Sequence, residues 1–205
     1  MKVLMINGSP HAAGSTFTAL KEMEKVFQQE GIGTELIHVG HLDIHGCIAC
    51  GKCRKLGHCV FKDIVNEVAV KLKEADGLVV GTPVYYASPA GGLLAFLDRL
   101  FYSASFDKRM KVGAAVISAR RAGTVASFDV INKYFSICGM PIATSQYWNE
   151  VHGGCAEDVV KDLEGMQTSR ELARNMTFLM KSIALGKQTY GLPDKEERVW
   201  TNFIR

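Results

Sequence analysis

The sequence lacks the features that would place the protein in a membrane, outside the cell or on nucleic acid. No run approaches the ~18 apolar residues of a membrane-spanning helix. The apolar start at residues 2–6 meets Asn7-Gly8 too early to form the core of a signal peptide. The net charge is only +3, which is too small an excess to indicate a nucleic-acid binder. These absences predict a cytoplasmic protein with neither a membrane nor a nucleic-acid partner.

The rest of the composition is that of a folded domain. The 205 residues suit one domain, and 47% hydrophobic with 22% charged residues argues against disorder. Five prolines against twenty glycines indicate tight turns, with no proline-rich linker. Six cysteines in a cytoplasmic protein are not expected to form a disulfide framework, so their spacing is more informative than their number.

Short apolar runs alternate with segments of helical period. The pattern predicts strands at 2–6, 34–39, 77–82, 111–118 and 141–146. It predicts helices at 16–29, 62–74, 89–103 and 124–138, and either one long helix or two broken helices at 157–185, with Pro89 in a first turn and Gly186 as the last stop. This alternation is typical of βαβ units. We therefore predict an α/β fold, a flavodoxin-like doubly wound five-stranded parallel sheet of order 2-1-3-4-5 with helices on both faces.

The predicted domain spans residues 1–186 and is followed by a C-terminal tail at 187–205. The domain includes a cysteine-rich loop at 40–60, after the second strand, which is long enough to suggest a function. The tail is polar except for an apolar segment at its end. Apolar side chains there are more stable when buried on a partner subunit, so a homo-oligomer is expected. Folding back onto the same subunit is the alternative. The apolar tail residues are Val199, Trp200, Phe203 and Ile204.

A glycine- and hydroxyl-rich loop at 8–16 joins the first strand to the first helix. Ligands of open α/β sheets bind beyond the carboxyl ends of the strands, where a helix N-terminus offers N–H groups to a phosphate. The loop is neither Gly-x-Gly-x-x-Gly nor a P-loop, which favours a single phosphate over a dinucleotide or a triphosphate. An ordinary turn with Ser15 or Thr16 as N-cap is the alternative. The candidate phosphate residues are Ser9, His11, Gly14, Ser15 and Thr16.

Two further loops leave strands at the same predicted edge. The first carries paired tyrosines that suit a flat aromatic ring, unless they only cover a helix end. The second carries paired arginines that could stabilise an electron-rich ring, unless both are solvated surface residues. The candidate ring-binding residues are Thr82, Pro83, Val84, Tyr85 and Tyr86 in the first loop, and Ser118, Arg120, Arg121 and Gly123 in the second.

The strongest motif is Cys47-x2-Cys50-x2-Cys53-x5-Cys59. Two-residue gaps let one stretch of backbone bring three thiolates to one inorganic centre, and the opening matches that of ferredoxin cluster ligands. We therefore favour a [4Fe–4S] cluster. A structural zinc ion is the first alternative, although zinc ligands more often come as two separated pairs. Four cysteines without metal are the second alternative. Cys138 and Cys155 are not expected to join this set.

Together with Leu97-Asp98-Arg99, these loops and the cysteine motif resemble the iron–sulfur flavoproteins, a branch of the NADPH-dependent FMN reductase family of flavodoxin-like proteins. The resemblance extends from Met1 to about Ala184. It implies FMN with its phosphate on Ser9, Ser15 and Thr16 and its ring between the two later loops. It also implies a [4Fe–4S] cluster on the four motif cysteines, near a flavin of a neighbouring subunit in a dimer or tetramer. His11 stands where relatives often carry arginine.

The expected function is that of an FMN-binding oxidoreductase that passes electrons between a [4Fe–4S] cluster and FMN. Ferredoxin or NAD(P)H would be the electron donor, and the cluster is expected to be sensitive to aerobic preparation. No acid–base residue is assigned, because the cofactors carry the chemistry. One alternative is an NAD(P)H-dependent FMN or quinone reductase without a cluster. The other is a zinc-stapled flavin-binding sensor that is not an enzyme.

Overall fold

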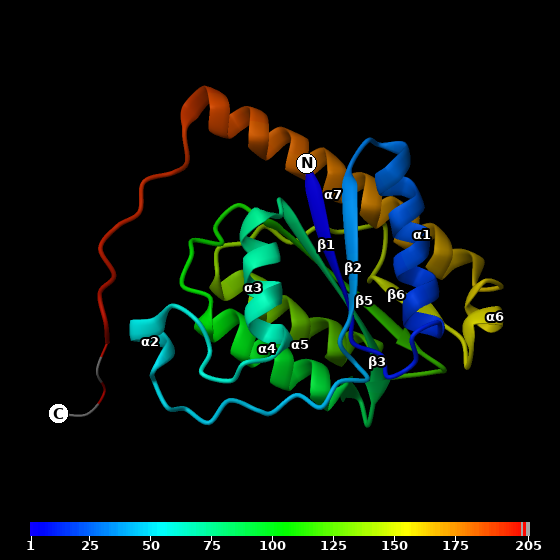
Figure 1. Cartoon of the computed structure of the whole chain (residues 1–205). Coiled ribbons are helices and arrows are strands. Elements are labelled where there is room, and N and C mark those ends of the chain that lie inside the picture. The colour runs from blue at the N-terminus through cyan, green and yellow to red at the C-terminus, as the bar shows by residue number, and fades with distance from the viewer. Residues whose placement is uncertain (202, 204–205) are drawn as a thin grey trace.

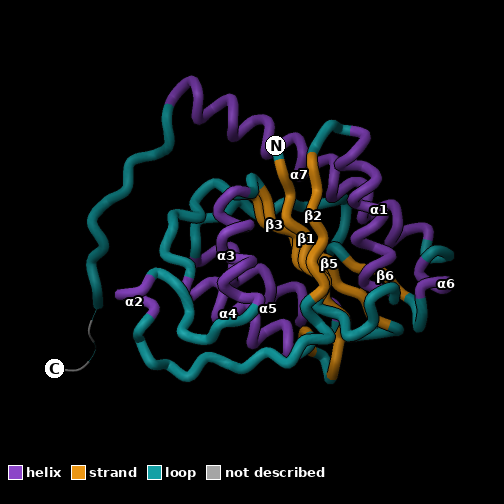
Figure 2. The backbone as a smooth tube through the Cα atoms, in the orientation of Figure 1, coloured by secondary structure: helices purple, strands orange, loops and turns teal. Residues whose placement is uncertain are grey.

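The fold was obtained as a computed structural model that describes residues 1–201 and 203. Asn202, Ile204 and Arg205 lie outside the described residues, so the predicted role of Ile204 in the tail is not addressed. A central sheet lies between two layers of helices, and the strands run with their carboxyl ends toward one edge (Figures 1 and 2). No helix in the described part of the chain is long and apolar enough to cross a membrane.

Five strands of the sheet are parallel and follow the order β2-β1-β3-β5-β6. In chain order these strands are the first to the fifth, so the predicted flavodoxin-like order 2-1-3-4-5 is confirmed. A two-residue strand, β4 (Ser88–Pro89), pairs antiparallel with the end of β3. The parallel strands are β1 (Lys2–Asn7), β2 (Gly33–His38), β3 (Gly77–Tyr85), β5 (Val112–Ala119) and β6 (Glu150–His152).

Strand residues alternate between two hydrophobic cores, as the pleat requires. Val3 and Met5 of β1 pack in the core under α1 and α7, while Leu4 and Ile6 pack in the core under α3, α4 and α5. Figure 1 shows these helix groups on opposite faces of the sheet. The helices are α1 (Ser15–Gln29), α3 (Ile64–Glu74), α4 (Gly91–Ser103), α5 (Thr124–Ile137) and α7 (Leu163–Tyr190), with short helices α2 (Cys53–Leu56) and α6 (Ala156–Val159).

The fifth strand is not where the sequence placed it. The predicted segment 141–146 contributes only an isolated parallel bridge between Gly113 and Ile142. Pro141 has no N–H for a ladder. Beyond it the Ser145 hydroxyl donates to the Tyr147 carbonyl at 2.6 Å, which bends the backbone away from the sheet. The chain returns as β6, which pairs with residues 117–119 of β5. The loop that follows β6 therefore reaches the carboxyl edge.

The last helical segment is broken into two helices, which is one of its two predicted forms, but its end lies beyond the predicted stop. The segment 157–185 contains the end of α6 and then most of α7, whose start is capped by Asp162, which accepts a hydrogen bond from Gly165 N at 2.9 Å. The helix does not stop at Gly186 but continues to Tyr190. An interior glycine costs a helix only about 1 kcal/mol, which the packed first half of α7 offsets. The described tail then runs extended beside the domain (Figure 1).

Candidate functional site

A cleft of about 770 Å³ opens at the carboxyl edge of the sheet. This volume lies within the range of small-molecule sites. The loops after β1, β3 and β5 form its walls, as the sequence predicts for a doubly wound sheet. Ten predicted residues line it: Ser9, His11, Gly14, Ser15, Thr16, Pro83, Val84, Tyr85, Ser118 and Arg120.

The loop after β1 is pre-organised around the start of α1. Asn7 Oδ1 accepts a hydrogen bond from Ser9 N at 3.0 Å, and Ser9 Oγ accepts one from His11 N at 3.2 Å. Helix α1 follows Gly14, and no side chain in the described part of the chain caps this N-terminus. Its first N–H groups therefore remain available to an anion, which fits a phosphate group.

Two hydroxyls of α1 tie this loop to the other walls of the cleft. Thr16 Oγ1 lies 2.7 Å from Ser118 Oγ in a buried contact, which joins the loop after β1 to the end of β5. Ser15 Oγ donates a long hydrogen bond of 3.4 Å to the Gly153 carbonyl. The cleft thus has a fixed floor at Thr16, while Ser15 is held only weakly and can turn to a ligand.

A tight hairpin shapes the wall after β3. Val84 pairs with Pro89, so Pro89 belongs to β4 and α4 begins at Gly91, two residues later than predicted. Tyr86 and Ala87 form the turn with φ of 48° and 61°, the left-handed backbone of a two-residue hairpin. Tyr85 lines the cleft, whereas Tyr86 stands fully exposed at the hairpin tip. The structure therefore separates the paired tyrosines.

Four predicted ring-binding residues do not line the cleft: Thr82, Tyr86, Arg121 and Gly123. Thr82 is buried, and its Oγ1 accepts a hydrogen bond from Ala90 N at 3.1 Å, so it shapes the hairpin. Gly123 has φ of 91°, and a Cβ there would lie 2.8 Å from the Ala87 Cα. Glycine at this position lets the loop after β5 pack against the hairpin.

The fourth wall of the cleft was not predicted from the sequence. Residues Gly153 to Glu157 line the cleft, and the misplaced fifth strand concealed them. The Gly153-Gly154 pair was the available signal, since it directly follows the strand that does reach the edge.

Within this wall the hydrogen bond between Cys155 and Glu157 raises the pKa of the thiol and lowers the pKa of the carboxyl. Cys155 is therefore a protonated thiol at neutral pH.

The four motif cysteines line a second, separate pocket. Cys47 and Cys50 are exposed, while Cys53 and Cys59 are half-buried. Ala49, Gly51 and Gly57 have positive φ, which lets this short segment turn sharply between its thiols. Arg99, Tyr102 and Ser103 of α4 form the floor. The structure thus brings together the four cysteines that the spacing selected.

The donors around this pocket fit an electron-rich sulfur centre. Ser103 Oγ is buried, borders the pocket and has no hydrogen-bond partner among the described residues. Arg99 Nε donates to Cys59 Sγ at 3.2 Å. Although burial lowers the pKa of Arg99, hydrogen bonds to Asp63 and Cys59 raise it above its ordinary value, so the guanidinium is charged.

The pocket between the thiols is narrow. The pocket encloses about 30 Å³, which is the space of one water molecule. Within residues 1–201 and 203, no three potential ligands converge on a single-ion geometry. Cys47 and Cys50 are exposed to solvent, whereas Cys53 and Cys59 are only partly exposed. Cys59 is fixed, because Asn66 bonds both its N–H and its carbonyl at 2.9 and 3.0 Å.

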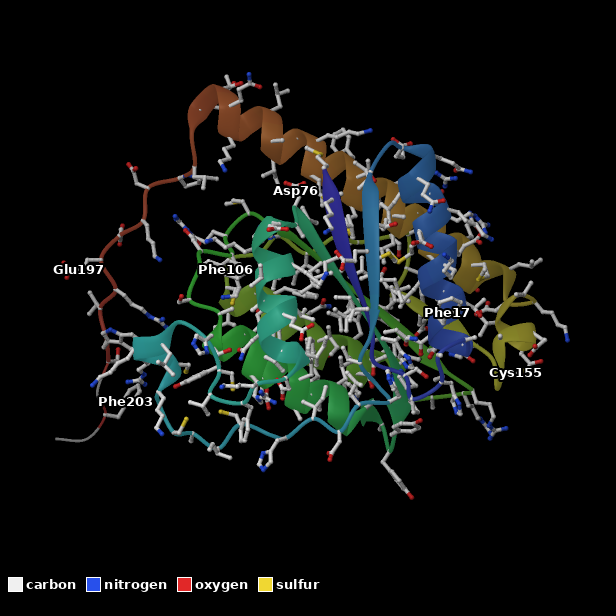
Figure 3. The ribbon with its side chains drawn as sticks, viewed as in Figure 1. Phe17, Asp76, Phe106, Cys155, Glu197 and Phe203 are labelled. Atoms are coloured by element: carbon white, nitrogen blue, oxygen red, sulfur yellow. The ribbon has the colours of Figure 1, made fainter. Side chains whose placement is uncertain are left out.

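The two pockets lie at different ends of the molecule. The loop that leaves β2 runs along the carboxyl edge of the sheet to α2 (Figure 2). Figure 1 places α2 and α6 on opposite sides, and Figure 3 labels Cys155, a cleft residue, on the α6 side. A ligand in the cleft is therefore not adjacent to the cysteine pocket of the same chain.

Comparison with known proteins identifies the family and the fold. The family model described as NADPH-dependent FMN reductase matches residues 1–153. An iron–sulfur flavoprotein of Methanocaldococcus jannaschii is 32% identical over 191 residues, covering 89% of this chain and 99% of the relative. An iron–sulfur flavoprotein of Methanosarcina thermophila is 29% identical, covering 89% and 97%. A solved archaeal flavodoxin superposes with a TM-score of 0.56 at 15% identity, covering 90% and 99%, which supports the fold.

Proposed function

Because the chain belongs to the NADPH-dependent FMN reductase family and is a flavin-dependent oxidoreductase, we propose that it passes electrons between a [4Fe–4S] cluster and FMN. The observation that carries this proposal is that Cys47, Cys50, Cys53 and Cys59 line one pocket, which the buried and unpartnered Ser103 Oγ also borders. Full-length relatives named iron–sulfur flavoproteins support it.

The cleft would hold FMN by its phosphate and its ring. The phosphate would lie on the start of α1, where Ser9, Ser15 and backbone N–H groups face the cleft, with His11 beside it. The ring would lie between Val84 and Tyr85 on one side and Arg120 on the other. Arg120 would offset negative charge that an electron-rich ring carries. When bound, FMN exchanges one or two electrons and the cluster exchanges one.

The separation of the two pockets in one chain favours transfer across a subunit boundary. Helix α2, which carries Cys53 of the cysteine pocket, and helix α6, which carries Ala156 of the cleft, lie on opposite sides of the molecule (Figure 1). In a homo-oligomer the cysteine pocket of one chain would face the cleft of another. The described tail supports such an assembly, because Val199 and Trp200 are 92% and 75% exposed. We therefore expect a dimer or tetramer in which the tail covers a neighbouring subunit.

Removal of the tail tests this assembly. Truncation after Lys195 should lower the native mass in light scattering by at least half, because it deletes the apolar segment but keeps the contact between Arg109 and the Pro193 carbonyl. A full-length chain with Val199→Ser and Trp200→Ser should show the same loss. An unchanged mass in both would remove the tail from the interface.

Electrons are expected to enter at the exposed cysteine loop. Lys52, Arg54 and Lys55 are exposed beside the pocket and would attract an acidic carrier such as a ferredoxin. Flavin reduction by reduced ferredoxin should slow as salt rises, because ions screen this attraction. Changing the three residues to glutamine should slow the bimolecular rate about tenfold at low salt. The same changes on the distant Lys21, Lys25 and Arg170 should have little effect.

NADPH is the alternative electron donor. Rapid flavin reduction by NADPH, with none by ferredoxin at any salt concentration, would favour the cluster-free reductase. Salt independence of the ferredoxin reaction would remove the basic residues from the docking site.

A further inference from the structure

Arg99 is the most completely engaged charged side chain near the cysteine pocket. Its side chain is 1% exposed, although α4 carries it close to the exposed loop. The guanidinium forms a two-pronged contact with Asp63, at 2.6 Å from Nη1 and 2.8 Å from Nη2. Nη1 also donates to the His45 carbonyl at 3.2 Å. The remaining nitrogen, Nε, donates to Cys59 Sγ at 3.2 Å.

The surroundings fix the direction of the Nε–H group. Asp63 caps α3 and accepts a hydrogen bond from Val65 N, so its carboxylate is itself held. The Phe61 ring lies against the guanidinium, with 4.8 Å from the Arg99 Cζ to the ring centroid. The His45 ring also stacks on Phe61, with 4.8 Å between the two ring centroids. A two-pronged contact fixes the plane of a guanidinium, so Nε–H is aimed at the sulfur rather than free to turn.

Asp63 not only orients Arg99 but also neutralises its charge. The pair contributes little net charge to the cysteine pocket, and what remains directed at Cys59 is a hydrogen bond. Hydrogen bonds to cysteine sulfur stabilise the more electron-rich state of an iron–sulfur centre and raise its reduction potential. Ser103 Oγ, buried and unpartnered within the described residues, lies on the same floor and can supply a second donor.

We propose that Arg99 is a positioning residue that raises the reduction potential of the centre held by the four cysteines, through its hydrogen bond to Cys59, with Asp63 limiting its charge. This inference rests on the proposed function, since it requires an iron–sulfur centre at the pocket. The proposal gives the Arg99–Asp63 pair a role in setting the reduction potential of the centre. An ion pair that only stabilises the fold would change stability and leave the potential unchanged.

The test is an EPR-monitored redox titration of the anaerobic holoprotein and its variants. Arg99→Gln should lower the equilibrium constant for reduction of the centre at least tenfold, which is about 59 mV for a one-electron couple. Asp63→Asn should shift the potential in the opposite direction, because it leaves the charge of Arg99 uncompensated. Asparagine also caps helices, so α3 is preserved. Arg170→Gln on the distant α7, with the same loss of charge, should change the equilibrium constant for reduction less than twofold.

The outcomes separate the two claims. Iron and sulfide are measured first, and their absence from the unchanged protein overturns the proposed function itself. Retained iron with an unchanged potential in Arg99→Gln overturns the role of Arg99 while the cluster stands. If Arg99→Gln loses its iron, the Asp63→Asn variant tests the role of Arg99 instead, because Arg99 remains in place in it. An unchanged or lowered reduction potential in Asp63→Asn overturns the proposal. The FMN potential serves as an internal reference that should not move.

Discussion

Replacement of any one of Cys47, Cys50, Cys53 or Cys59 by alanine is expected to abolish iron and sulfide binding in anaerobically purified protein. The four thiols line one pocket, and each would supply one ligand to a [4Fe–4S] core. Loss of one ligand exposes an iron atom to solvent. We therefore expect all of the bound iron and sulfide to be lost, and not only one iron atom. The visible absorption of the centre should disappear, while FMN content should remain that of the unchanged protein.

The two other cysteines are matched controls. Cys138 is half-buried in the core under α3, α4 and α5, and Cys155 lies on the wall of the cleft. Alanine at either position should leave iron and sulfide unchanged. Stoichiometric zinc without iron in anaerobic protein would contradict the cluster and favour the zinc-stapled sensor. Full iron in a single motif variant would remove that cysteine from the ligand set.

The second large effect is expected at the start of α1. Changing Ser15 and Thr16 together to alanine should weaken FMN binding about 100-fold or more, because a hydrogen bond to a charged group contributes ~1.5–3 kcal/mol. Riboflavin lacks the phosphate, so its affinity should fall far less. Fluorescence titration of the deflavinated protein with each flavin measures the two dissociation constants.

Ser118→Ala separates the phosphate effect from a change in loop structure. This variant breaks the same buried contact between Thr16 and Ser118 but keeps both hydroxyls of α1. It should weaken FMN and riboflavin by similar factors. Equal losses of the two flavins in the Ser15 and Thr16 double variant would show that the loop does not hold the phosphate.

Periodicity was sufficient to predict most of the fold, because the first four parallel strands and their helices have unbroken local signals. Val3 to Ile6, for example, are fully buried on both faces of the sheet, which the continuous apolar run indicates. The fifth strand was misplaced because its apolar segment at 141–146 resembles a strand more than Glu150–His152 does. Tertiary contacts with the end of β5, which no local pattern reveals, decide that pairing.

The candidate site was predictable where residues are consecutive in the sequence. The four cysteines and the loop at 8–16 each lie within one short stretch of sequence. In the structure the cysteines line one pocket, and the loop lines the cleft. The contact between Arg99 and Cys59 joins positions forty apart, so spacing did not predict it. The wall at Gly153 was missed for the same reason, since it depends on the strand before it. Tyr86 shows the opposite error, because the turn that exposes it depends on backbone φ and not on composition.

The most direct test of electron transfer between the two cofactors is anaerobic stopped-flow reduction of the flavin by reduced ferredoxin, in unchanged protein and in Cys50→Ala. The account predicts rapid flavin reduction in the unchanged protein and loss of that reaction in the cluster-free variant, although FMN stays bound. Equal rates in the two proteins would contradict it, because the flavin would then receive its electrons without the centre that the cysteines hold.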